Sequence, residues 1–319
     1  MKAIVYRQYG SPDVLRLEEV EKPTPTDDEI LIKIHATSVN RSDWEGLIGK
    51  PLYARIGGLR KPRHPILGSD IAGRVEMVGK NHKNFQPGDE VFGDILSHKG
   101  GFAEYVCVRG NVMALKPANL TFEQVSTIPQ AGVIALQGIR DKVQPGQKVL
   151  INGAGGGGVF AIQLAKLYGA EVTAVDNTGK LDFMRSVGAD HVVDYMREDF
   201  TKTGKQYDMV LDLVAHRSIF AYLRALKPGG SYYFVGGSVA LLFQLLVFGP
   251  IISRITGKNI RFLAVQPTRK DLESFTELVA TGKITPIIDK TFPLSQVPQA
   301  LRYLGEGRAK GKIVITMKM

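Results

Sequence analysis

The chain of 319 residues is long enough for two domains, and its 44% hydrophobic content is that of an ordinary globular protein. Its single cysteine, Cys107, excludes an intrachain disulfide and a structural zinc site made of three or four thiolates. The net charge of +10 would suit an anionic partner, but the basic residues are scattered and no nucleic-acid motif accompanies them. Residues 1–6 enter a strand pattern without the apolar core of a signal peptide, so we expect a cytoplasmic protein.

The first 122 residues have the pattern of a β-rich domain. Residues 30–37 alternate between apolar and polar side chains, which is typical of a half-buried strand. Turns rich in Gly and Pro separate further short strands, and this arrangement predicts a small barrel-like domain. We interpret Cys107 as a packed strand residue rather than a nucleophile. The other predicted strands are Ile71–Val78, Glu90–Gly93, Phe102–Val108 and Val112–Leu115.

Residues 123–267 alternate between strand-like and helix-length segments. This alternation predicts an α/β domain with a doubly wound, parallel, six-stranded sheet and right-handed crossovers. Residues 268–319 add two helices, about Lys270–Thr281 and about Val297–Gly305, and a strand, Lys312–Thr316; we expect them to return to the first domain. The six predicted strands are Lys148–Asn152, Glu171–Asp176, His191–Asp194, Met209–Leu213, Tyr232–Val235 and Ile260–Val265.

A run of glycines lies between the first of these strands and a helix. Gly153, Gly155 and Gly158 fill the three positions of a dinucleotide fingerprint, and Ala154, Gly156 and Gly157 complete the run. The first glycine permits a tight turn, the second lets the backbone approach a pyrophosphate, and the third lets the helix pack closely on the strand. The helix N-terminus then directs its N–H groups at the phosphates. A glycine turn without a ligand is the alternative, but the flanking strand and helix favour dinucleotide binding.

The identity of the dinucleotide depends on residues that follow the next two strands. Asp176 ends the second strand, where a carboxylate can accept hydrogen bonds from ribose hydroxyls and repel a 2′-phosphate, which favours NADH. Lys180 and Tyr195 are suited to bind a 2′-phosphate, which favours NADPH. The alternative role of Asp176 is that of a turn or cap residue. NADPH and NADH therefore both remain candidates.

Beyond the glycine run, a family pattern runs through Ala36–Trp44, His64–Gly73, Pro87–Gly93, Val187–Tyr195 and Lys310–Ile315. Together these segments resemble the medium-chain dehydrogenase/reductase superfamily, and within it the zinc-independent, quinone-oxidoreductase-like branch. The resemblance covers nearly the whole chain. It implies a GroES-like catalytic domain, a Rossmann domain and an active site in the cleft between them. Besides the glycine run, it places on the cofactor Asn40, Val214, Val235, Gly236, Gly237 and Lys312.

The chain departs from the zinc-dependent members of that superfamily at the metal ligands. Asn40 stands where those enzymes have a ligand cysteine, and Gly68-Ser69-Asp70 stands where they have Gly-His-Glu. Neither an amide nor a hydroxyl replaces a thiolate or an imidazole as a zinc ligand. We therefore expect no zinc. Without a Lewis acid, oxidation of simple alcohols is less favoured than hydride transfer to a quinone or an α,β-unsaturated carbonyl, whose conjugation spreads the developing charge.

Three residues near the end of the strand at 30–39 are candidates for catalysis. The amide of Asn40 could donate to the substrate oxygen, or it could close an Asx-turn. We expect Asp43 to be a structural residue, or one that positions the groups that contact the substrate. Trp44 could stack on a flat substrate or pack between the domains, and Tyr53 is a weaker candidate for the cleft.

Two other functions are compatible with the same motifs. One is a zinc-free NAD(P)-dependent alcohol dehydrogenase. The other is a nucleotide-binding protein without catalysis, which would hold RNA or a membrane through its basic surface. The latter draws on Ile134, which stands where related reductases often have a cofactor-binding Thr.

The segment Val239–Ile252 is unusually apolar. Its length of about fourteen residues and the Gly249-Pro250 pair make it too short and broken to span a bilayer. It could be a buried helix or subunit interface, line a lipophilic pocket for the carbonyl or quinone substrate, or contact a membrane surface peripherally. Pairing of Ile260–Val265 with a second copy would give the homodimer that we expect.

Overall fold

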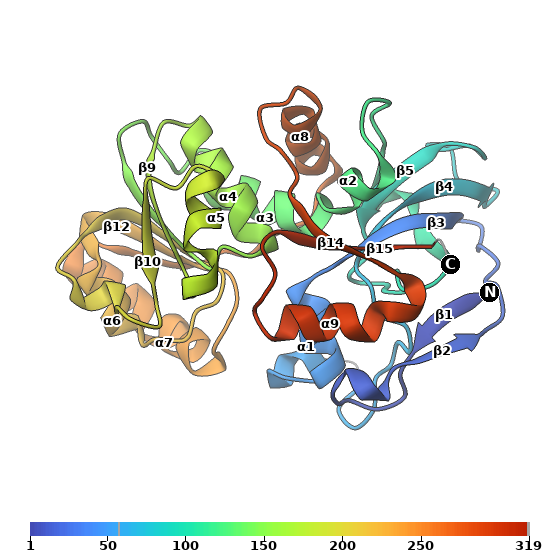
Figure 1. Ribbon diagram of the computed structural model, residues 1–319, viewed down its shortest axis with the longest axis horizontal. Helices are drawn as coiled ribbons and strands as arrows, with labels where there is room; N and C mark the ends of the chain where they lie inside the picture. Colours follow the sequence, from blue (N-terminus) through green and yellow to red (C-terminus); the bar gives the residue numbers. More distant parts are fainter. Residues whose placement is uncertain (57, 318–319) are drawn as a thin grey trace. The chain divides into compact units, whose positions relative to one another are not determined.

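In a computed structural model, which describes residues 1–56 and 58–317, the chain divides into two compact units. The first unit consists of Met1–Ala131, Pro267–Gly282 and Pro286–Met319, and the second of Gly132–Gln266 and Lys283–Thr285. The predicted boundary between residues 122 and 123 lies within the first unit, because helix α2 (Phe122–Ser126) packs on its strands β3 and β4. Figure 1 shows the course of the chain through both units.

The first unit is built on a mostly antiparallel seven-stranded sheet, in the order β14-β15-β3-β4-β5-β7 with β6 paired to β3. Alternating side chains of the central strands β3 and β4 fill its interior, with Ile30, Ile32, Ile34, Ile71 and Val75 buried. Strands β1 (Lys2–Val5) and β2 (Arg16–Glu19) form a separate antiparallel pair. The strands of the large sheet are β3 (Glu29–Val39), β4 (Asp70–Val78), β5 (Glu90–Asp94), β6 (Tyr105–Arg109), β7 (Met113–Leu115), β14 (Ile288–Pro293) and β15 (Lys312–Thr316).

The helices of the first unit connect and cover these strands. Helix α1 (Arg41–Ile48) follows β3 directly and ends at Gly49, whose φ of 62° is the left-handed conformation that favours glycine. Helices α8 (Arg269–Ala280) and α9 (Val297–Gly305) come from the last part of the chain, as predicted. Short 3₁₀ turns occupy Pro12–Val14, Leu52–Arg55, Gly110–Val112 and Leu294–Gln296.

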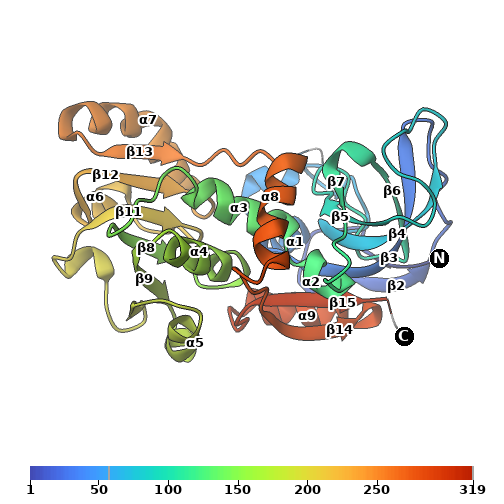
Figure 2. The same ribbon diagram turned by 90° about the horizontal axis from the view of Figure 1, so that it is seen from above.

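The second unit contains the predicted Rossmann sheet. Its six strands are all parallel and follow the order β10-β9-β8-β11-β12-β13, so the strand order reverses between β8 and β11 (Figure 2). In sheets of this type, ligands bind beyond the carboxyl ends of the strands at that reversal. The strands are β8 (Lys148–Asn152), β9 (Glu171–Asp176), β10 (His191–Asp194), β11 (Tyr207–Asp212), β12 (Leu226–Phe234) and β13 (Asn259–Phe262).

Helices connect these parallel strands and cover the sheet. The chain leaves the first unit within α3 (Pro129–Ile139), α4 (Gly156–Leu167) packs on β8 and β9, and α5 (Leu181–Ser186) packs on β10. Side chains of α6 (Ile219–Arg224) and α7 (Val239–Thr256) share one buried cluster with strand residues, including Tyr222, Leu241 and Leu245. Short 3₁₀ turns occupy Thr178–Lys180 and Phe200–Lys202.

The structure differs from the predictions in three places. Strands β2 and β14 were not expected, and β13 ends at Phe262 rather than at Val265. The apolar segment from Val239 forms an 18-residue helix that continues through Pro250.

Candidate functional site

The glycine run forms the turn between β8 and α4 in the second unit. Gly153 adopts φ 100°, a conformation that L side chains rarely adopt, and its N–H donates to the carbonyl of Val175 at 2.9 Å. A Cβ on Gly158 would lie 1.9 Å from the carbonyl oxygen of Gly153, so only glycine fits there. These two glycines therefore fix the turn and the close approach of the helix.

Gly155 has a different environment. It precedes the first turn of α4, and a Cβ added there would meet nothing within 4 Å. The first turn of α4 itself holds no acidic residue. Open space beside the N–H groups of a helix N-terminus fits the pyrophosphate of a dinucleotide.

Asp176 faces the glycine turn. One carboxylate oxygen accepts from the backbone N–H of Ala154 at 2.8 Å and from the ammonium of Lys180 at 3.1 Å. The other oxygen accepts from the backbone and side-chain N–H groups of Asn177, at 2.8 and 3.1 Å. Four donors occupy the roughly four acceptor sites of a carboxylate. The predicted contact of Asp176 with ribose would therefore require one of these bonds to break, and the observed role of Asp176 is to anchor the turn.

Lys180 and Tyr195 follow the ends of β9 and β10, as predicted, but they differ in exposure to solvent. Lys180 is buried with Asp176, whereas Tyr195 is 41% exposed. Arg197, which we did not predict, contributes a side chain that is 79% exposed and lies 3.6 Å from Asp194. In the sequence, Arg197 could have been found because it follows β10 and stands two residues after Tyr195, which we had predicted to bind a 2′-phosphate.

The predicted nicotinamide-side residues lie where β11 and β12 end. Val214 lies against Gly153, because a Cβ on that glycine would be 2.9 Å from the Val214 side chain. The N–H of Ala215 donates to Gly236, and the N–H of Val235 donates to Asp212, both at 2.9 Å. Gly237 has φ 140°, and a Cβ there would lie 2.0 Å from the carbonyl oxygen of Ala215. The structure thus brings the glycine run, Val214 and the turn at 235–237 to one edge of the sheet.

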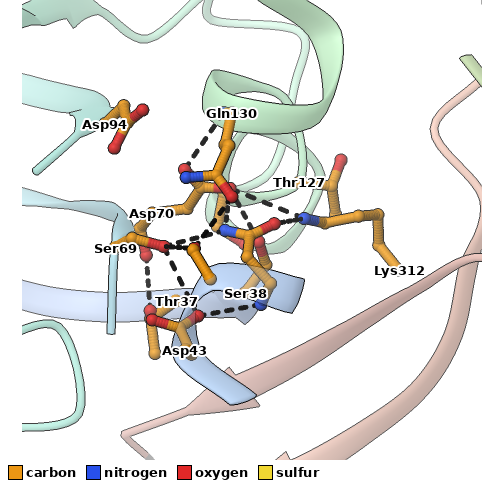
Figure 3. Close-up of polar contacts among 12 residues, drawn as sticks. Thr37, Ser38, Asp43, Ser69, Asp70, Asp94, Thr127, Gln130 and Lys312 are labelled. Carbon is orange, nitrogen blue, oxygen red and sulfur yellow. Dashed lines mark hydrogen bonds and ion pairs between the residues drawn. The ribbon is translucent and has the colours of Figure 1, made fainter. Parts of the chain in front are cut away.

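Two of the catalytic candidates, Asn40 and Asp43, lie in a buried polar cluster of the first unit, and Figure 3 shows this cluster around Asp43, Ser69, Asp70 and Lys312. The side-chain nitrogen of Asn40 donates to Ser69 Oγ at 3.0 Å and to Asp70 Oδ2 at 2.8 Å. Its side-chain carbonyl accepts from the ammonium of Lys312. A flipped amide would turn its oxygen to the carboxylate and its N–H groups to the ammonium, so the observed orientation is the one that the charges require.

This arrangement bears on the two roles predicted for Asn40, donation to the substrate oxygen and closure of an Asx-turn. An amide has two N–H hydrogens, and Ser69 and Asp70 take both. Asn40 therefore has no N–H left to donate to a substrate oxygen. What remains is the second lone pair of its carbonyl oxygen, which makes it an acceptor.

Asp70 and Lys312 form a buried ion pair, with Nζ and Oδ2 3.5 Å apart. Burial raises the pKa of Asp70 and lowers that of Lys312, and each charge opposes the shift of the other. Asp70 also accepts from the backbone N–H of Gln130 at 3.1 Å and from Ser38 Oγ at 3.1 Å. We did not single out Asp70 as a site residue, because a carboxylate inside a strand pattern gives no sign of its partner so far along the chain.

Two further carboxyl groups belong to the same region. Asp43 accepts from the backbone N–H groups of Asn40 at 2.8 Å and Gly68 at 3.2 Å, which supports the predicted supporting role. Burial raises its pKa to about 7, with a smaller contribution from the charge of Asp70. Burial, and then the charge of Asp70, likewise raise the pKa of Asp94 to about 7. The cluster thus holds more carboxyl groups than it can keep ionised near neutral pH.

The aromatic candidates have structural partners. Trp44 lies against helix α9, where a Cβ on Gly305 would come within 2.3–2.6 Å of the indole ring. Its observed role is packing within the first unit. Tyr53 donates to Glu45 at 3.4 Å from a 3₁₀ turn, and burial raises its pKa to about 12.

Three comparisons with known proteins bear on these sites. Residues 26–118 match the alcohol dehydrogenase GroES-like domain, and residues 187–315 match the family described as zinc-binding dehydrogenase. The 2-methylene-furan-3-one reductase of Solanum lycopersicum is 36% identical, over 99% of this chain and 79% of its own. The NADPH-dependent alkenal/one oxidoreductase of Arabidopsis thaliana is 33% identical over the same shares. The solved quinone oxidoreductase of Coxiella burnetii is 31% identical, with a TM-score of 0.90 over 100% of this chain and 99% of that one.

The chain belongs to the medium-chain dehydrogenase/reductase superfamily, in the branch of the quinone oxidoreductases. It is an NAD(P)H-dependent oxidoreductase with a GroES-like and a Rossmann domain, which confirms the predicted class and fold. The activities in the names of these relatives agree with the predicted reduction of quinones and activated alkenes rather than with either alternative.

The family description raises the question of zinc. An amide with both ends bonded, a hydroxyl and a buried ammonium are not zinc ligands. Among residues 1–56 and 58–317, no group of three His, Cys, Asp or Glu side chains is arranged to hold a metal ion. The residues at this site therefore do not fit zinc, in spite of the family's name.

Proposed function

We propose that the protein reduces a quinone or an α,β-unsaturated carbonyl with NADPH and without a metal. The open cradle at Gly155, between two glycines that fix the turn, is the observation that carries this proposal. When bound, the dinucleotide supplies the hydride. The chain holds its pyrophosphate at the N–H groups of α4 and its nicotinamide half beside Val214, Val235, Gly236 and Gly237.

The state of Asp176 supports NADPH over NADH. Lys180 neutralises the carboxylate that would otherwise repel a 2′-phosphate, and the bonds to Ala154 and Asn177 turn it towards the glycine run. Tyr195 and Arg197 present an exposed hydroxyl and an exposed guanidinium at the end of the neighbouring strand. Guanidinium groups bind phosphate through paired N–H donors.

The polar cluster supports a reaction without zinc. Conjugation in the substrate spreads the negative charge that develops on hydride transfer, so no Lewis acid is required at the oxygen. We assign Asn40 as an acceptor for a hydroxyl of the bound cofactor or substrate. Asp43 and Lys312 hold it in position, and Trp44 of α1 packs against α9.

Two further features belong to the proposal. The strand β13 is an edge strand of its sheet. Because an unpaired strand edge can pair with another chain, we propose a homodimer joined along β13. The lone cysteine, half-buried and with its pKa raised to about 11 by burial, is compatible with a cytoplasmic protein. Light scattering after gel filtration tests the homodimer.

The activity is tested by oxidation of NADPH and of NADH at 340 nm, each with a panel of quinones and enones. We expect turnover with at least one member of the panel, faster with NADPH, and unchanged after dialysis against a zinc chelator. Absence of turnover with either nucleotide, although calorimetry shows that the nucleotide binds, would overturn the proposal. Loss of activity on chelation would overturn its metal-free part.

A further inference from the structure

Helix α7 has an apolar face towards solvent. Four residues at helical spacing, Leu241, Leu245, Gly249 and Ile252, form its buried stripe. The opposite side exposes large apolar side chains, with Phe243 64%, Leu246 63% and Ile255 78% exposed. The other exposed members of this face are Val239, Val247, Phe248 and Ile251, and Phe220 of α6 extends it at a ring distance of 6.1 Å from Phe248.

A helix on the surface of a soluble monomer carries polar residues on its outer side. A continuous exposed apolar face of this kind marks a contact with another body. By length and composition alone, α7 could cross a membrane. Its buried stripe, however, packs on β12 and β13, so the helix is held along the surface of the unit. This geometry fits a helix that lies in an interface and not one that spans it.

The charges around α7 distinguish between the bodies that could cover it. No Asp or Glu occurs between Asp212 and Asp271, a stretch that contains α6, β12, α7 and β13. Arg254 lies in the last turn of α7, and Lys258 follows the helix. Three other basic residues of the stretch, Arg217, Lys227 and Arg269, pair with Asp199, Asp208 and Glu273, and the remaining ones are Arg224, Arg261 and Lys270.

A second copy is the less suitable partner for this face. A two-fold contact places the same patch on both subunits, so the apolar face and its basic end would meet a second copy of Arg254 and Lys258. An anionic lipid surface offers both properties that the helix matches. Its acyl chains take up the apolar side chains, and its head groups attract the basic residues at the end of the helix.

We propose that the solvent face of α7 docks peripherally on an anionic lipid surface. This inference rests on the proposed reductase activity and adds a class of substrate: quinones or enones with a long hydrocarbon tail, which partition into the bilayer. Docking through α7 holds the nucleotide-binding unit at the surface where such substrates reside.

Flotation with lipid vesicles tests the docking without nucleotide or substrate. We expect the wild-type protein to float with vesicles of phosphatidylcholine and phosphatidylglycerol, and to do so at least tenfold less with phosphatidylcholine alone. The variant Phe243→Ser/Leu246→Ser should lose at least tenfold of its binding to the anionic vesicles. The variant Arg254→Gln/Lys258→Gln should lose the preference for the anionic lipid.

A matched control replaces two exposed apolar residues of the first unit, Leu17→Ser/Met77→Ser, and should float like the wild type. Turnover of a short-chain, water-soluble quinone should be the same in all variants, which shows that they fold and tests the reductase activity separately. A tailed quinone in anionic vesicles should be reduced at least tenfold more slowly by Phe243→Ser/Leu246→Ser and by Arg254→Gln/Lys258→Gln, and at the wild-type rate by the control variant.

Two results would overturn the docking. One is wild-type protein that stays in the soluble fraction with anionic vesicles. The other is a Phe243→Ser/Leu246→Ser variant that changes from dimer to monomer in light scattering while its flotation stays at the wild-type level, because the face would then hold a second copy. Turnover of the short-chain quinone that persists with no flotation would remove the docking and leave the proposed function intact.

Discussion

Lys312 donates to the side-chain carbonyl of Asn40, across 272 residues of sequence. The ammonium therefore fixes which end of the amide faces Asp70, and it interacts with the charges of three carboxyl groups, those of Asp70, Asp43 and Asp94.

Lys312→Met should be strongly destabilising, because it leaves Asp70 buried without its cation. Removal of one partner of a buried ion pair costs about 3–5 kcal/mol in the free energy of unfolding. The double variant Lys312→Met/Asp70→Asn removes both charges and should recover part of the loss. Urea unfolding of the three proteins measures both effects, and a Lys312→Met variant as stable as the wild type would contradict the ion pair.

Asp94→Asn should stabilise the protein increasingly as the pH rises. The pKa of Asp94 is raised to about 7 in the folded state, above the value of about 3.9 in an unfolded chain. The carboxyl group of the wild type therefore contributes fully below about pH 4, and its contribution is lost as the pH rises through about 7. An asparagine does not titrate.

The free energies of unfolding of wild type and Asp94→Asn, compared between pH 5 and pH 8, test this prediction. The variant should gain by about 1 kcal/mol or more over this range. A difference that stays constant with pH would show that Asp94 ionises normally in the fold.

Gly155→Ala and Gly158→Ala should separate the binding of the cofactor from the stability of the turn. A methyl group at Gly155 meets nothing in the protein, so the variant should melt with the wild type and lose its affinity for NADPH by at least about tenfold, or about 1.4 kcal/mol. A methyl group at Gly158 collides with the carbonyl of Gly153, so that variant should be unstable even without nucleotide. Thermal melts and calorimetry measure the two properties, and normal NADPH affinity in Gly155→Ala would place the pyrophosphate elsewhere.

Arg197→Ala should discriminate between the two nucleotides. Loss of one charged contact to the 2′-phosphate should raise the KM for NADPH about tenfold, or about 1.4 kcal/mol, and leave the KM for NADH unchanged. Arg185→Ala, which removes an exposed arginine paired with Asp182, is the matched control. An equal rise of KM for both nucleotides would show that Arg197 attracts any nucleotide by its charge and does not contact the 2′-phosphate.

Gly305→Ala should displace Trp44, since the added methyl group would overlap the indole ring. Trp44 is the single tryptophan of the chain, so its fluorescence reports the change directly. We expect a red shift and a lower melting temperature. Gly249→Ala, where the nearest neighbour of the new Cβ would lie at an ordinary 3.6 Å, should leave the spectrum unchanged.

Local patterns were sufficient to predict the Rossmann unit. The bounds of β8, β9 and β10 agree with the prediction residue by residue, because each is a short buried run set off by turn residues. The roles of Gly153 and Gly158 were also predictable, since the fingerprint contains both residues and a Cβ on Gly158 would meet the carbonyl oxygen of Gly153.

The polar cluster depends on partners that no local pattern connects. Asn40 bonds with Ser69, Asp70 and Lys312, which are 29, 30 and 272 residues away in sequence. That the Asn40 side chain can act only as an acceptor is evident only once all three of these partners are known. The outer face of α7 was equally hidden, because a helix that is apolar all round has no stripe from which its buried side can be predicted.

The strand that carries Lys312 has a consequence for the order of folding during synthesis. β15 fills the place between β14 and β3, and it leaves the ribosome only after every residue of the second unit. The nucleotide-binding unit can fold while translation continues, but the sheet of the first unit stays open, with Asp70 still lacking its ion-pair partner Lys312. A nascent chain arrested before residue 312 should therefore be protected from protease in the second unit and cleaved readily in the first.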